Sequence, residues 1–185
     1  MEALEAVAAL VAERNQVDAR IAAITGRPPV AGHLGEWIAS QVFDLELEDS
    51  ATTRAIDGRF RSGPLRGETV NVKWYGKQER ILDMTSDPSL DHYLVLTGPR
   101  APVASSRGGV RPLLIEAVYL IDANALRFDL EARGRRVGTA ASVRREWWDR
   151  SQIYPEARHS KLTIDERQRT MLALFGSPSA EASAR

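Results

Sequence analysis

The stretch VNVKWY at residues 70–75 decides the fold. Its apolar side chains are Val70, Val72 and Trp74, and the residues between them are Asn71, Lys73 and Tyr75. A period of two is the pattern of a β-strand that packs one face against a core. A second run, HYLVLT at residues 92–97, is apolar almost throughout, as in a buried central strand. The two runs predict a sheet in the middle of the chain.

Helical and further strand patterns lie on both sides of these two runs. The spacing of Val7, Leu10, Val17, Ile21 and Ile24 predicts a helix over residues 2–24, with Arg14 interrupting the apolar seam. Further helices are expected at residues 34–43, 122–133 and 144–150, and a last one after a capping box of Thr163 and Glu166. Further strands are expected at residues 51–60 and 113–121, and a short helix or irregular crossover at 78–88.

This order of elements predicts an α/β protein, with a mixed sheet flanked by helices and additional N- and C-terminal helices. A chain of 185 residues is long enough to form its own core without a metal or disulfide. We expect a single domain over residues 1–176, with an N-terminal helix at 1–26 and a C-terminal extension at 113–176. Residues 177–185 (SPSAEASAR) are expected to be a disordered tail.

Composition excludes several classes of protein. The chain has 25 basic and 25 acidic residues, which argues against a strongly basic coat protein for nucleic acid. It has no cysteine, so disulfides, thiolate metal sites and cysteine nucleophiles are excluded. No uncharged apolar run is long enough to span a membrane, and Glu2 and Glu5 stand where a secretory signal is basic. We therefore expect a cytoplasmic protein with no membrane partner.

Four residues form a candidate site. Glu36 lies on the expected helix at 34–43, Asp57 lies in the first strand region, and Asn71 and Lys73 share one face of the next strand. If the two strands pair, Asp57, Asn71 and Lys73 converge. Carboxylate and amide oxygens with a nearby lysine suit a hard cation and a phosphate.

At these residues the chain resembles the PD-(D/E)XK nuclease superfamily. The segments GHLGEWIA, AIDGRF and VNVKWYGK carry the resemblance, and they are also similar to an uncharacterised bacterial family. The resemblance covers residues 32–98 and implies a restriction-endonuclease-like core, ordered helix-strand-strand-strand-helix-strand. In that superfamily a glutamate often lies on the first core helix, an aspartate on the second strand and an acid-x-lysine on the third. Glu36, Asp57 and Asn71-x-Lys73 take those places here.

The resemblance implies a metal-dependent hydrolysis of DNA. Asp57 would be the main ligand of Mg²⁺ or Mn²⁺, Glu36 would bind the metal directly or through water, and Asn71 would be a further ligand. Lys73 would orient the attacking water or stabilise negative charge. The sequence departs from the family at Asn71, where a carboxylate is usual, so this site carries one negative charge fewer and should bind the cation more weakly.

Basic residues around the candidate site would contact the phosphates of DNA. They are Arg54, Arg59, Arg61, Arg66 and Lys77. A second arginine-rich segment spans residues 133–150 and could extend the basic face. Ordinary solvated surface arginines explain both segments equally well.

The same residues also admit purely structural roles. Glu36 could simply complement a helix dipole, Asp57 could start a turn with Gly58, and Lys73 could protect a strand edge. The whole fold could be an inactive module that binds nucleic acid or a partner protein, an alternative that Asn71 favours. The chain could also be a structural homodimer held by the N-terminal helix, whose seam has only Arg14 as a polar member.

Overall fold

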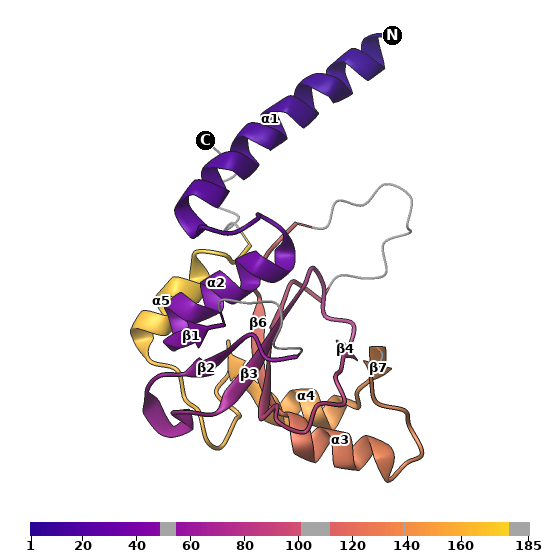
Figure 1. Cartoon of the computed structure of the whole chain (residues 1–185), viewed down its shortest axis with the longest axis vertical. Coiled ribbons are helices and arrows are strands. Elements are labelled where there is room, and N and C mark those ends of the chain that lie inside the picture. Colours follow the sequence, from indigo (N-terminus) through magenta and orange to yellow (C-terminus); the bar gives the residue numbers. More distant parts are fainter. Residues whose placement is uncertain (49–54, 101–111, 139, 178–185) are drawn as a thin grey trace.

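The structure of the chain is a computed structural model. It describes residues 1–48, 55–100, 112–138 and 140–177. Over these residues the protein is an α/β fold with a mixed sheet of six strands and a separate sheet of two strands (Figure 1). Arg54, the segment 101–111 and residues 178–185 of the expected tail lie outside the described residues.

The six-stranded sheet is built around the two runs that the sequence singled out. In order across the sheet its strands are β1 (Leu45–Leu47), β2 (Gly58–Phe60), β3 (Thr69–Tyr75), β5 (His92–Thr97), β6 (Ala117–Asp122) and β8 (Gln152–Tyr154). The central pair, β3 and β5, is parallel, with Val70 opposite His92 and Tyr75 opposite Thr97. All other neighbours are antiparallel. β6 and β8 come from the expected extension, so it completes the same sheet.

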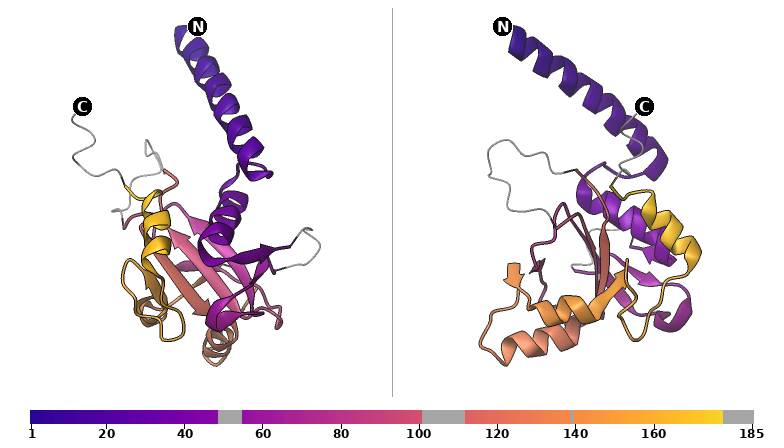
Figure 2. Two further views of the ribbon diagram at one scale, coloured as in Figure 1. Left: turned by 90° about the vertical axis from the view of Figure 1, so that its left-hand side faces the viewer. Right: turned by 180° about the vertical axis from the view of Figure 1, so that it is seen from behind.

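Helices cover both faces of this sheet (Figure 2). They are α2 (Ala31–Phe43), α3 (Ala123–Glu131), α4 (Arg145–Ser151) and α5 (Glu166–Ala173). α2 and α5 lie against one face, where Ile38, Val72 and Leu172 belong to a common buried cluster. α3 and α4 lie against the other face, where Tyr93 and Leu126 are buried together. The mixed sheet flanked by helices is therefore confirmed.

The helix α1 (Glu2–Thr25) leaves this body and projects away from it (Figure 1). Gly26 ends the helix with a left-handed backbone, φ 68°, which glycine adopts without a steric cost. None of its described residues is buried. Within the described parts of the chain, no helix is long and apolar enough to cross a membrane.

The crossover between β3 and β5 differs from the expected core order. Residues 76–91, all of them described, form β4 (Ile81–Asp83) and irregular chain. This matches the irregular crossover that the sequence allowed and not the helix that the resemblance implied. β4 pairs with β7 (Ala140–Ser142) in the small sheet. Leu82 and Met84 of this crossover are buried in the same cluster as Tyr93 and Leu126. β4 and the chain after it therefore cover part of the sheet face on which α3 and α4 lie.

Two other predictions were wrong in detail. The last helix is capped by Asp165 and Gln168, whose side chains bond each other's backbone N–H groups, and not by Thr163 and Glu166. β1 lies in an acidic stretch for which no strand was predicted. Only one of its three residues, Leu45, is buried, so the stretch shows no alternating apolar pattern. Between β2 and β3 a short 3₁₀ turn, η1 (Gly63–Leu65), buries Leu65.

Candidate functional site

Asp57 directly precedes β2, and both its backbone and its side chain form hydrogen bonds with the backbone of β3. Its backbone N–H donates to the Val70 carbonyl at 2.9 Å, and its Oδ2 accepts from the Val72 N–H at 2.7 Å. The carboxylate thereby occupies the position that a strand neighbour would take beyond the end of β2. A Cβ on the next residue, Gly58, would lie 2.4 Å from the Glu46 carbonyl oxygen, so only glycine allows this approach of β1. The backbone therefore fixes the orientation of Asp57.

Glu36 reaches the same region from α2. A Cβ on the preceding residue, Gly35, would lie 3.1 Å from the Trp74 Cβ, so a glycine lets α2 pack closely on the end of β3. Arg27, in the joint between α1 and α2, forms an ion pair with Glu36 at 2.6 Å and donates to the Glu48 carbonyl at 3.3 Å. The Glu36 side chain is only 16% exposed, so the ion pair is partly shielded from water.

Asn71 and Lys73 belong to the same side of β3, as their alternation predicted. Asn71 is buried, and its Nδ2 donates to the Ala55 carbonyl at 3.0 Å, two residues before Asp57. Its Oδ1 is buried without a hydrogen-bond partner among the described residues. Lys73 is half-buried. An amide oxygen without a partner is costly unless something else binds it.

The charges of this region act on one another. Burial raises the pKa of Glu36, the neighbouring Asp57 raises it further, and Arg27, His33 and Lys73 oppose the rise. Burial also raises the pKa of Asp57, whereas the hydrogen bond from Val72 and the side chains of Lys73, Arg27 and His33 lower it. Arg27, His33, Glu36, Asp57 and Lys73 are thus within electrostatic range of one another and are here called the Glu36–Asp57 cluster.

Of the four residues predicted from sequence, Glu36, Asp57 and Lys73 lie within electrostatic range of one another. Asn71 follows Val70 and precedes Val72, the two residues whose backbones bond Asp57, and its own side chain bonds the Ala55 carbonyl.

The basic residues that were predicted to contact phosphates have other partners. Arg61 forms a 2.6 Å ion pair with Asp44, and Arg59 donates to the Gly67 carbonyl at 3.4 Å. Arg61 and Arg66 lie beside η1, beyond the end of β2, whereas Arg59 lies within β2, two residues after Asp57. Lys77 pairs with Glu79 just beyond β3.

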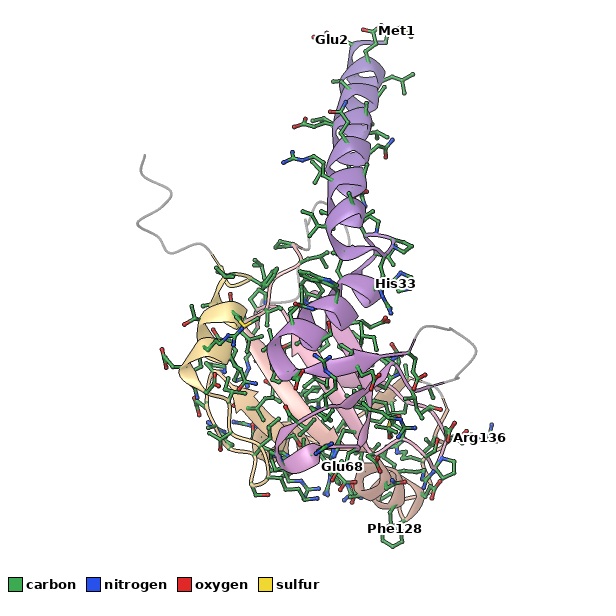
Figure 3. All side chains as sticks on the ribbon, turned by 60° about the vertical axis from the view of Figure 1, so that its left-hand side comes forward. Met1, Glu2, His33, Glu68, Phe128 and Arg136 are labelled. Atoms are coloured by element: carbon green, nitrogen blue, oxygen red, sulfur yellow. The ribbon has the colours of Figure 1, made fainter. Side chains whose placement is uncertain are left out.

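Figure 3 illustrates the separation of two parts of the body. His33 lies close to the place where α1 meets the body, whereas Glu68 lies lower on the body, well away from His33 (Figure 3). Arg61, already held by Asp44, is an exposed surface ion pair, and such pairs contribute little. The hairpin arginines are therefore not part of the Glu36–Asp57 cluster.

Sequence reasoning missed Arg27 and His33. Arg27 stands between Gly26 and Pro28, a segment that indicates only the end of a helix. His33 precedes Glu36 by three residues on α2, a spacing that puts two side chains on one helix face. Its Nδ1 is buried and has no hydrogen-bond partner in the described part of the chain. The i, i+3 spacing was the one signal that could have linked it to Glu36.

The donor set suits a weakly held hard cation. Two carboxylates and the Asn71 Oδ1 supply oxygen ligands, and Mg²⁺ is commonly bound by one or two carboxylates while it keeps several waters. Over the described residues there is no group of three or more His, Cys, Asp or Glu side chains arranged to hold a metal. Arg27 and Lys73 also offset the two negative charges. Glu36 and Asp57 could therefore hold Mg²⁺ or Mn²⁺ only if water supplied most of its ligands.

A second basic surface lies apart from this cluster. A pocket of about 560 Å³ between α3 and β7 is lined by Arg133, Arg135, Arg136 and Arg144. Asp129 pairs with Arg133 at 2.5 Å and lies 3.7 Å from Arg144. Figure 3 places Arg136 well away from His33, so this pocket does not adjoin the Glu36–Asp57 cluster.

The comparisons with known proteins add no further constraint. No protein-family model matches the chain, and the search of curated proteins found no match. Its function is therefore argued from the geometry of these residues.

Proposed function

We propose that this is a nuclease-like protein in which the Glu36–Asp57 cluster binds Mg²⁺ or Mn²⁺ and hydrolyses phosphodiester bonds of DNA. One observation carries the proposal. Two partly buried carboxylates, from α2 and from the entry to β2, share an electrostatic environment with a lysine of β3. Burying like charges together destabilises a fold, so such an arrangement is typical of a functional site.

The sheet topology supports the same proposal. β1, β2 and β3 are successive antiparallel neighbours, and β5 adds in parallel beside β3. This agrees with the strand part of the restriction-endonuclease-like core that the sequence resembles, whereas β4 replaces the helix of its crossover. The family's acid and lysine positions fall at adjoining ends of β2 and β3, where Asp57 bonds Val72.

Each residue of the proposed site would have a separate role in the hydrolysis. A bound cation would supply a water of lowered pKa and polarise the phosphate. Asp57 Oδ1 is not used by the Val72 bond and can face the cation, while Asn71 Oδ1 is a buried acceptor without a described partner. Lys73 would stabilise the negative charge that develops on the phosphate oxygens.

DNA cleavage with matched variants tests the proposal. Supercoiled, linear and single-stranded DNA would be incubated with Mg²⁺ or Mn²⁺, with chelator as the metal-free control. Asp57→Asn removes the charge but keeps an oxygen for the Val72 N–H, and Lys73→Met keeps the apolar stem. Each should reduce cleavage about 10²- to 10³-fold. Asp44→Asn, a carboxylate at the other end of the hairpin, should cleave as the wild type does. Equal cleavage by all four proteins contradicts the proposal.

A second candidate function is favoured by the Arg27–Glu36 ion pair. Arg27 occupies one Glu36 oxygen at 2.6 Å, and Asn71 stands where the family has an acid. Both features suit an inactive module that binds nucleic acid or a partner protein. Asn71→Asp separates the two: a gain in cation affinity and cleavage supports the enzyme, whereas binding of DNA with no cleavage by either protein supports the module.

A further inference from the structure

We infer that α1 pairs with the α1 of a second copy of this chain, in antiparallel orientation. The helix has 24 residues, and within the described chain none of them is buried. Val7, Leu10, Val17 and Ile24 are between 44% and 75% exposed. In proteins most of the stability of a helix comes from packing of its apolar face, so the exposed apolar seam of α1 calls for a partner helix.

The seam has the spacing of a coiled coil. Its positions alternate by three and four residues, and they are Val7, Leu10, Arg14, Val17, Ile21 and Ile24. Arg14 is the one charged member, and its Nε forms an ion pair with Asp18 Oδ2 at 3.6 Å within the helix. That ion pair draws the guanidinium toward the border of the seam and leaves the other five side chains for packing.

Charge complementarity selects the orientation. Glu13 and Arg20 flank the seam on the same side, one heptad apart. In a parallel pair Glu13 would lie opposite the partner's Asp18, and the two Arg14 residues would meet in one layer. In an antiparallel pair Glu13 lies opposite the partner's Arg20, twice by symmetry, and Arg14 lies opposite the partner's Val17.

The register and the shape agree with this orientation. Antiparallel alignment about the Arg14–Val17 layers places Leu10 opposite the partner's Ile21 and Val7 opposite the partner's Ile24. Every other layer of the seam is then apolar on both sides. α1 projects from the body with its N-terminus at the far tip (Figure 2), so antiparallel pairing places the two bodies at opposite ends of the helix pair.

The oligomeric state of the full chain tests the pairing. Sedimentation or light scattering should give a mass approaching twice 20.5 kDa as concentration rises. Leu10→Lys should weaken association about tenfold or more, because the charge enters two layers of the pair. Ala9→Lys, on the opposite face of α1, is the matched control and should associate as the wild type does. Circular dichroism of both variants checks that the body remains folded.

The orientation has its own test, because the chain contains no cysteine. Val7→Cys protein mixed with Ile24→Cys protein should form a mixed disulfide, and each alone should cross-link poorly. Glu13→Lys should weaken association a few-fold, since the new ammonium group would face the partner's Arg20; in a parallel pair the same change would strengthen it. A chain that is monomeric throughout the concentration series, or cysteines that cross-link only to their own kind, would overturn the inference.

Discussion

Arg27 donates a 2.6 Å hydrogen bond to Glu36 and so ties the joint after α1 to the carboxylate cluster. The same guanidinium reaches the Glu48 carbonyl that follows β1. One side chain thus links the projecting helix, α2 and the edge of the sheet. It also decides how much of Glu36 is available to a cation, because it occupies one of the two carboxylate oxygens.

Removing Arg27 should strengthen cation binding. Arg27→Ala releases a Glu36 oxygen and removes a positive charge that repels Mn²⁺, so affinity should rise about tenfold at about pH 8, where the carboxylates are ionised. Calorimetric titration with Mn²⁺ measures it. Arg61→Ala is the matched control, because it frees Asp44 at the other end of the hairpin and should leave affinity unchanged. A fall in affinity would mean that Arg27 positions Glu36 for the cation.

Asp57→Asn should change how stability depends on pH. Folding raises the pKa of Asp57 above its ordinary value of 3.8. Between pH 3.8 and the pKa of the folded protein, the folded state therefore binds more protons than the unfolded state. The stability that this group contributes is fully present below pH 3.8 and is lost as pH rises through the folded pKa. The free energy of unfolding of Asp57→Asn, relative to the wild type, should therefore increase with pH. Urea unfolding across the pH range checks this, and a constant difference would contradict it.

Gly58→Ala should destabilise the fold by about 1–3 kcal/mol, as overpacking does. Its Cβ would lie 2.4 Å from the Glu46 carbonyl oxygen, so β1 must move away from β2. Because Asp57 precedes this glycine, cation binding should weaken as well. Gly32→Ala is the control: no atom lies within 4 Å of its Cβ, and in α2 it should stabilise by about 0.5–1 kcal/mol. Chemical denaturation of both variants measures the difference.

Asp165→Ala should cost about 1 kcal/mol in the free energy of unfolding, because it removes the N-terminal cap of α5. Thr163→Ala should cost far less, since Thr163 is exposed and stands outside the capping box. Thermal unfolding of the two variants distinguishes the sequence prediction from the observed cap. A larger loss in Thr163→Ala than in Asp165→Ala would support the original assignment.

The central strands were predictable because their patterns are strong. The alternation through Val72 and the apolar run through Leu94 specify two strands whichever neighbours they have. β1 and β4 could not be predicted, because each has three residues and only one of them is buried, so their pairing is decided by distant partners. The α5 cap was missed because Asp165 and Thr163 are both residue types that suit a cap.

Much of the candidate site was also predictable. Glu36, Asp57 and Lys73 could be grouped from a resemblance and from strand alternation, and the structure places them within electrostatic range. Arg27 could not be grouped with them, because its partner depends on how the joint after α1 folds back on α2. The arginines of the β2–β3 hairpin were grouped with Asp57 because they are near it in sequence, but nearness in sequence does not fix the partner of a side chain, and Arg61 pairs with Asp44 instead.

The length of α1 sets a distance. Its 24 residues span about 36 Å at about 1.5 Å per residue. In an antiparallel helix pair, that length would separate the two Arg27 joints and the carboxylate clusters attached to them. One turn of B-form DNA measures about 34 Å. In the dimer and the DNA cleavage that we propose, the length of α1 would therefore set the interval along the duplex between the phosphates that the two copies reach.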